Sequence, residues 1–229
     1  MSEYEDKVQY AVSHTEVVRS PQQRLNTFGA TDIHYYLLTE PMDSVNETRV
    51  REGRVIAERP KLVTPTYLLS IFEGFGEHDR EEIQAILDSH GGDPNILEYK
   101  YRNEVKDTWT LSENISDVVL KMNSKIDEEG DSLAAIVKGP DDAWQIALMR
   151  FITDITKSSL QQNIADLSSR GLLDREQGIP KFVKEEIEGL FRAVAEDRAS
   201  IGDLGSKLRS YGLFEQYQDR FFALLDRKR

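Results

Sequence analysis

The fold of this chain is decided by one stretch, GPDDAWQIALMRFITDITKSSLQQNIADLSSRGLL at residues 139–173. Asp141 and Asp142 suit the start of a helix, because carboxylates stabilise the positive end of the helix dipole. Apolar residues then recur at helical spacing in two stripes: Trp144, Leu148, Phe151 and Ile155 in one, and Ile146, Met149, Ile152, Leu160, Ile164 and Leu167 in the other. Both stripes coexist only up to Ile155. We therefore expect a long central helix that is buried nearly all round in its first half and on one face in its second.

The chain before this helix carries the pattern of a small sheet. Aromatic and β-branched residues favour strands, and we predict strands at Thr31–Thr39, Ile96–Arg102, Asp107–Leu111 and Leu133–Val137. Apolar and basic residues surround Glu52–Gly53 within Thr48–Pro60, which predicts a hairpin with a tight turn at those two residues. We expect residues 1–30 to form a polar arm with a short helix before Ser20.

Helix signals fill most of the remaining chain. Capping residues and apolar spacing predict helices that begin at Thr64, Asp79 and Ser112, and three short helices that begin after Pro180, at Ser200 and at Phe214. We therefore predict an α+β fold. A small, mostly antiparallel sheet with flanking helices occupies residues 31–138, and a helical unit organised on the long helix occupies residues 139–229. We expect the two units to share a core.

Composition limits the class of protein. A chain of 229 residues with 39% apolar and 31% charged residues is typical of a soluble globular protein. It has no cysteine, which excludes disulfides, thiol nucleophiles and cysteine metal sites. No apolar run approaches the roughly 18 residues of a membrane span, and the acidic start lacks the apolar core of a signal peptide. We expect a cytoplasmic protein that does not bind membranes.

The net charge of −12 is unevenly distributed. Residues 1–62 carry 10 acids and 8 bases, residues 63–140 carry 16 and 7, and residues 141–229 carry 15 and 14. The acidity therefore lies in the middle of the chain. This balance argues against broad binding to nucleic acid or anionic lipid, whose surfaces are themselves negative, but it leaves room for a local basic patch.

The strongest candidate site is a basic ribbon on the predicted hairpin, formed by Arg49, Arg51, Arg54, Arg59 and Lys61. Exposed arginines can bind phosphates or a partner's carboxylates through two hydrogen bonds each. The plainer interpretation is a solvated edge strand protected by its charges, or pairing with the acidic middle of the same chain. The ribbon lacks the exposed aromatic residues on which single-stranded nucleic acid stacks.

Three other candidates are weaker. One cluster contains metal-ligating residue types, namely His78, Asp79, Glu82 and His90. About ten helical residues would hold its two histidines roughly 15 Å apart, too far for one ion. Lys138–Asp142 lies at a strand-to-helix junction, but its aspartates repel phosphate and it has no glycine-rich cradle. His34 is expected to be a hydrogen-bonded core residue. We therefore assign no metal and no cofactor.

Two aromatic pairs, Tyr35–Tyr36 and Phe221–Phe222, are each expected to place one ring in the core. The other ring of each pair would then face outward, where exposed aromatic residues favour contact surfaces.

No motif in the sequence identifies an activity. We rank first a non-catalytic cytoplasmic interaction or assembly protein, which binds a protein partner or a second copy of itself through the basic hairpin and the acidic middle region. The first alternative is an RNA- or ribosome-binding factor that uses Arg49–Lys61. The second is an enzyme of unknown class, with Asp141, Asp142 and His34 as acid–base groups. It requires these three side chains to share a pocket, because proton transfer needs hydrogen-bond reach.

Overall fold

A computed structural model describes residues 3–43, 45–63 and 96–227. The helices predicted at Thr64 and Asp79, and the cluster from His78 to His90, lie outside these residues. By its contacts the chain divides into two compact units, Met1–Pro60 with Tyr99–Asn163, and Lys61–Glu98 with Ile164–Arg229. The predicted division into residues 1–30, 31–138 and 139–229 stays a prediction. A division by contacts does not test which segments fold together.

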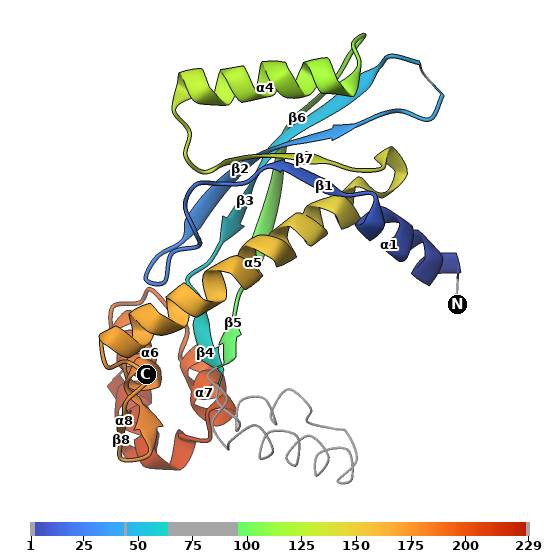
Figure 1. The fold of residues 1–229 in the computed structure, drawn as a ribbon. Helices are drawn as coiled ribbons and strands as arrows, with labels where there is room; N and C mark the ends of the chain where they lie inside the picture. The colour runs from blue at the N-terminus through green and yellow to red at the C-terminus, as the bar shows by residue number, and fades with distance from the viewer. Residues whose placement is uncertain (1–2, 44, 64–95, 228–229) are drawn as a thin grey trace. The chain divides into compact units, whose positions relative to one another are not determined.

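The first unit contains a five-stranded sheet in the order β1-β7-β2-β3-β6 (Figure 1). Its strands are β1 (Glu16–Arg19), β2 (Thr31–Thr39), β3 (Thr48–Ala57), β6 (Tyr101–Leu111) and β7 (Ala134–Lys138). The consecutive strands β2, β3 and β6 pair antiparallel, β7 runs parallel to β2, and β1 runs antiparallel to β7. The sheet is therefore mixed and mostly antiparallel, and the predicted α+β class is confirmed.

One long helix lies on each face of this sheet (Figure 1). Helix α4 (Ile115–Glu129) connects β6 to β7, and helix α5 (Trp144–Ser169) follows β7 after a 3₁₀ turn at Asp141–Ala143. Asn114 starts α4, because its side chain accepts a hydrogen bond from the Asp117 amide. The predicted long helix after Pro140 is confirmed.

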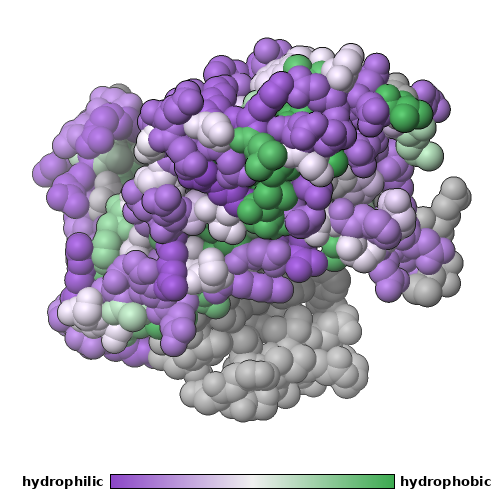
Figure 2. Space-filling model, turned by 45° about the horizontal axis from the view of Figure 1, so that its top comes forward, coloured by the Kyte–Doolittle hydropathy of each residue, from purple (hydrophilic) through white to green (hydrophobic). Residues whose placement is uncertain are grey.

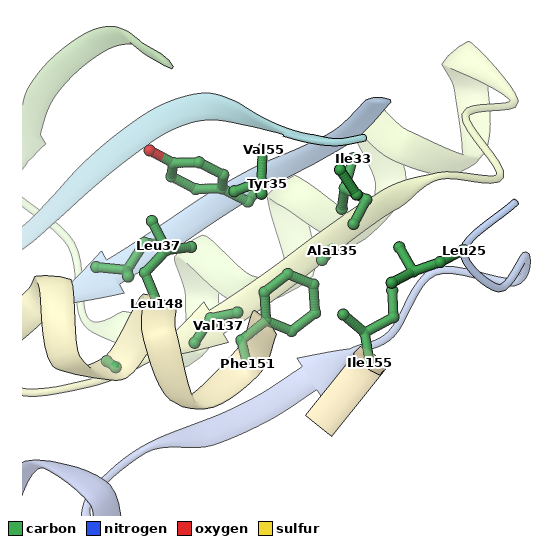
Figure 3. Packing of buried hydrophobic residues seen from close by; sticks show 12 residues of the cluster. Leu25, Ile33, Tyr35, Leu37, Val55, Ala135, Val137, Leu148, Phe151 and Ile155 are labelled. Carbon is green, nitrogen blue, oxygen red and sulfur yellow. The ribbon is translucent and has the colours of Figure 1, made fainter. Parts of the chain in front are cut away.

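Strand β2 is largely apolar on both sides because a helix covers most of each side. Tyr35 and Leu37 belong to the cluster that packs under α5, where Leu148 and Phe151 point toward the sheet (Figure 3). Tyr36 belongs to the cluster under α4. Tyr35 is 0% exposed and Tyr36 is 5% exposed, so the prediction that one of these rings faces outward is wrong.

Helix α5 buries one face in its first half. Ala147, Leu148 and Phe151 are buried against the sheet, but Met149 is 65% exposed. The prediction that this half is enclosed nearly all round is therefore wrong. A sheet covers a helix from one side only, so the second apolar stripe is left at the flank of the contact.

Strand β3 is continuous, and the predicted hairpin turn at Glu52–Gly53 is wrong. Glu52 pairs with Tyr36 and Gly53 with Tyr35 in an uninterrupted antiparallel ladder. The strand predicted at Asp107–Leu111 is the end of the longer β6, and the predicted polar arm contains a sheet strand, β1. These strands were missed because their patterns are set by pairing partners distant in the sequence. The short helix predicted before Ser20 is present as α1 (Glu3–Ser13).

The second unit contains three short helices in the described part of the chain: α6 (Lys181–Ala195), α7 (Ile201–Ser210) and α8 (Phe214–Arg227). It also contains two strand pairs, β4 (Lys61–Val63) with β5 (Ile96–Glu98), and β8 (Arg175–Glu176) with β9 (Ile179–Pro180). The Ser200 side chain caps α7 by accepting from the Asp203 amide. The three predicted C-terminal helices are confirmed. None of the described helices has the length and apolar character of a membrane span.

Candidate functional site

The predicted basic ribbon is distributed over both faces of the sheet. Residues that alternate along a strand face opposite sides, so Arg49 and Arg51 share the α5 face of β3, whereas Arg54 lies beyond Gly53 on the α4 face. The two groups therefore cannot bind one ligand together.

Arg49 and Arg51 both bind Asp141, which follows β7. Arg49 Nη1 lies 2.5 Å from one carboxylate oxygen, and Arg51 Nη2 lies 2.8 Å from the other. The Thr39 hydroxyl donates to the same carboxylate at 2.7 Å, and the Arg51 guanidinium lies 5.1 Å from the ring centre of Trp144. Arg51 is only 8% exposed. It is a buried structural residue.

Burial alone would raise the pKa of Asp141. The hydrogen bonds from Thr39 and Arg51, together with the charges of Arg51 and Arg49, outweigh it and lower that pKa below its ordinary value. The carboxylate is therefore ionised at neutral pH and holds both arginines in place.

The other ribbon residues also lie beside acids or on the surface. Arg54 bridges Asp32 at 3.1 Å and Glu104 at 2.7 Å across the sheet. Lys61 belongs to the second unit, as does Glu186, which lies 3.7 Å from it. Arg59 is exposed after the end of β3. The RNA-binding alternative stays a prediction.

The acid–base groups of the enzyme alternative are not brought together. Asp141 and Asp142 line a cavity beside Lys138 and His14, whereas His34 lines a different one. Thr39 binds Asp141 and is five residues along β2 from His34. At the rise of a strand, Thr39 and His34 therefore lie about 16 Å apart. The odd spacing also places them on opposite faces.

A cavity of about 570 Å³ lies on the α4 face of the sheet, near the C-terminal end of that helix. Its floor comes from β2, β3 and β6, and its other walls come from α4 and the residues that follow it. The charged or titratable side chains that line it are His34, Tyr36, Glu52, Arg54, Glu104, Lys106, Lys125, Glu129 and Asp131. Its volume lies within the usual range for small-molecule sites.

Two lysines converge on one carboxylate in this cavity. Lys106 Nζ lies 2.5 Å from one oxygen of Glu52, and Lys125 Nζ lies 3.9 Å from the other. The hydrogen bond and charge of Glu52 raise the pKa of Lys106. A hydrogen bond with Tyr36 is the main reason that the pKa of Lys125 is also raised. Both lysines are therefore charged at neutral pH.

His34 lies at the other side of the cavity. Its Nδ1 is 2.5 Å from Asp131 Oδ2, and its side chain is 53% exposed. The predicted hydrogen bond is therefore present, but the prediction that His34 is a core residue is wrong. It occupies a part of the sheet that α4 does not cover.

Sequence reasoning missed the cavity because its members come from five separate segments. Asp131 is 97 residues from His34, and no local spacing connects them. A usable signal was present, since His34 is a polar residue inside the otherwise apolar run from Ile33 to Leu38. A polar residue in such a run marks a position where the sheet face is exposed to solvent or where the side chain binds another polar group.

No group of three or more His, Asp and Glu side chains in the described ranges is arranged to hold a metal ion. Comparisons with protein-family models, curated proteins and solved structures found no match to this chain.

Proposed function

We propose that the protein is a non-catalytic cytoplasmic assembly protein that associates with a second copy of itself through strand β6. One observation carries this proposal. Strand β6 has eleven residues, lies at an edge of the sheet that the described residues form, and has seven exposed residues. An unpaired row of amides and carbonyls at a sheet edge is a template for another strand.

One hydrogen bond shows which residues of β6 direct their backbone amide and carbonyl groups away from the sheet. The Glu58 amide donates to the Lys100 carbonyl at 2.9 Å, just before β6 begins. Bonded and non-bonded pairs alternate in an antiparallel ladder, so Arg102 and Glu104 direct their backbone groups toward β3. Tyr101, Asn103 and Val105 therefore direct theirs away from the sheet.

The first half of β6 is complementary to itself. In an antiparallel pair with its two-fold axis at Asn103, Arg102 lies opposite Glu104 of the second copy, and Tyr101 lies opposite its Val105. Arg102 already lies 3.1 Å from Glu104 of its own chain, so pairing between copies exchanges this exposed contact for one across the interface. Opposite charges at facing positions contribute about 0.2–1 kcal/mol for each pair. The register shift at Lys106 ends the regular ladder, which limits the pairing to residues 101–105.

Other surfaces support association less well. Figure 2 shows a face that is mostly hydrophilic, with its apolar side chains in small, separate areas. The basic ribbon that the sequence favoured has Arg49 and Arg51 already bound to Asp141. The edge of β6 offers backbone groups at residues 101–105 as a surface for association.

Substitution of Asn103 tests the proposal, because its amide points outward. Asn103→Pro removes that amide and leaves the bonds of Arg102 and Glu104 to β3 intact, which an edge strand tolerates. Asn103→Thr keeps the backbone amide but, like Asn103→Pro, lacks the Asn103 Oδ1 that accepts from the Tyr35 hydroxyl, so it is the matched control. Sedimentation equilibrium over a concentration series should show dimers for the wild type and Asn103→Thr, and monomers for Asn103→Pro.

A wild-type protein that is monomeric at every concentration contradicts the proposal and favours a protected edge, since charges and bulges also prevent strand pairing. A dimer that Asn103→Pro leaves intact assigns the association to another surface. Circular dichroism of each variant establishes that the fold is retained.

A further inference from the structure

The cavity on the α4 face carries positive charge on one side. Lys106 and Lys125 share the single carboxylate of Glu52, so one positive charge is left over. Lys125 also lies over the Tyr36 ring, with its Nζ 4.9 Å from the ring centre. This side of the cavity can therefore accept a carboxylate from a ligand.

The other side carries negative charge from Glu129 and Asp131, and the one arginine that lines it, Arg54, already binds Asp32 and Glu104. Glu129 ends α4, where the helix dipole is itself negative. Glu129 makes no hydrogen bond or ion pair within the described residues, although its charge acts on Lys125. Asp131, the next carboxylate along the chain, binds His34 Nδ1 through one oxygen and accepts from the Leu133 amide through the other, and it adds a second negative charge to this side. This side can accept an ammonium group.

We infer that this cavity binds a small zwitterion, of which a free α-amino acid is the simplest form. Lys125 and Glu129 stand four residues apart on α4, and such neighbours have Cβ atoms about 6 Å apart. The two charges of the ligand must therefore lie close together, as they do in an α-amino acid. A long chain between them would not fit this spacing. The inference does not depend on self-association.

Two other ligand classes fit the cavity less well. A simple anion would meet Glu52, Glu104, Glu129 and Asp131 along with the cations, so the lining as a whole opposes it. A metal ion lacks ligands, because the described residues contain no suitable group of three His, Asp and Glu side chains. A ligand that carries both charges uses each side of the cavity and is repelled by neither.

Calorimetric titration of the full chain with each of the twenty standard amino acids tests the inference. At least one should bind, and its N-acetyl and carboxamide derivatives, which each lack one charge, should bind at least tenfold more weakly. Lys125→Gln and Glu129→Gln should each weaken binding at least tenfold. Lys121→Gln is the control, because Lys121 lies on the same helix but pairs with Glu113 outside the cavity.

Three results would overturn the inference. They are the absence of binding by all twenty amino acids, equal binding by a derivative with one charge, and equal effects of the Lys121 and Lys125 substitutions. Equal binding by the N-acetyl derivative alone would show a simple anion site. Both cavity substitutions replace exposed or half-buried side chains, so circular dichroism should show an unchanged fold.

Discussion

The Asp141 carboxylate connects three strands of the sheet. It follows β7, accepts a hydrogen bond from Thr39 at the end of β2, and binds two arginines of β3. Its side chain is 15% exposed and that of Arg51 is 9% exposed. Removing one partner of such a pair leaves the other charge buried without compensation, which costs more than the intact pair contributes.

We expect Asp141→Asn to lower the free energy of unfolding at neutral pH by about 3 kcal/mol, the size measured for broken buried ion pairs. Asp142→Asn is the matched control. The Asp142 side chain is 55% exposed and pairs with Lys7, so its loss should change stability by less than about 0.5 kcal/mol. Urea denaturation followed by circular dichroism measures both values.

The same pair of proteins has a defined pH dependence. Because the folded pKa of Asp141 is lowered, its stabilisation is complete above the pKa of an unfolded aspartate, about 3.9, and is lost as the pH falls through the lower folded value. The stability difference between the wild type and Asp141→Asn should be constant near neutrality and shrink below about pH 4. A difference that stays constant into strong acid would show that the carboxylate charge is not responsible.

At the scale of an element, Gly53 makes room on β3 for the Tyr35 ring. A Cβ atom at Gly53 would lie 2.5 Å from the Tyr35 hydroxyl oxygen, 2.6 Å from the Tyr35 Cζ and 2.7 Å from the Glu104 carbonyl oxygen. The glycine that suggested a turn in the sequence is therefore a packing residue. The hydroxyl of the same tyrosine donates to Asn103 at 2.9 Å on the neighbouring strand β6.

We expect Gly53→Ala to destabilise the protein by about 2 kcal/mol, within the range for overpacked sites. Gly29→Ala is the control, because a Cβ there would meet no atom within 4 Å, and its effect should stay below about 0.5 kcal/mol. Thermal unfolding of the two variants provides the comparison. Gly53→Asn separates the straight strand from a hairpin turn, since a turn would tolerate asparagine and the strand would not.

At the scale of the whole molecule, the net charge of −12 opposes association between two copies. Salt screens this repulsion, because the Debye length falls from about 30 Å at 0.01 M to about 8 Å at 0.15 M. Backbone hydrogen bonds between β6 strands depend little on salt. Association between a basic ribbon and an acidic region would depend on salt in the opposite sense.

We therefore expect dimerisation through β6 to strengthen as sodium chloride rises from 0.01 M to 0.15 M, in sedimentation equilibrium at neutral pH. Association that weakens over this range would favour the route through the ribbon. Arg49→Gln distinguishes the two routes further. It should weaken association through the ribbon and leave association through β6 unchanged, because this partly exposed arginine belongs to the ribbon and lies away from residues 101–105.

The parts of the fold that could be predicted are those with a strong local pattern. Strand β2 was predicted with its observed bounds, since all nine residues form one β-favouring run. Helix α5 was predicted from its apolar spacing, and α7 from its capping serine. Strand β1 has only four residues, and its identity as a strand depends on pairing with β7, which is more than 100 residues away. No local pattern reports such a pairing.

The sequence by itself determined the segments with a strong local pattern, such as β2, α5 and α7, and hence the α+β class, because periodicity depends on near neighbours. Only the tertiary structure decided what the charged residues do. Arg51 is buried against Asp141, and His34 meets Asp131 beside a cavity. The reason is physical: the environment of a charge is set by the strands and helices that surround it. The 139–173 stretch predicts its own helix, but only the sheet decides that Asp141 at its head serves to hold two arginines.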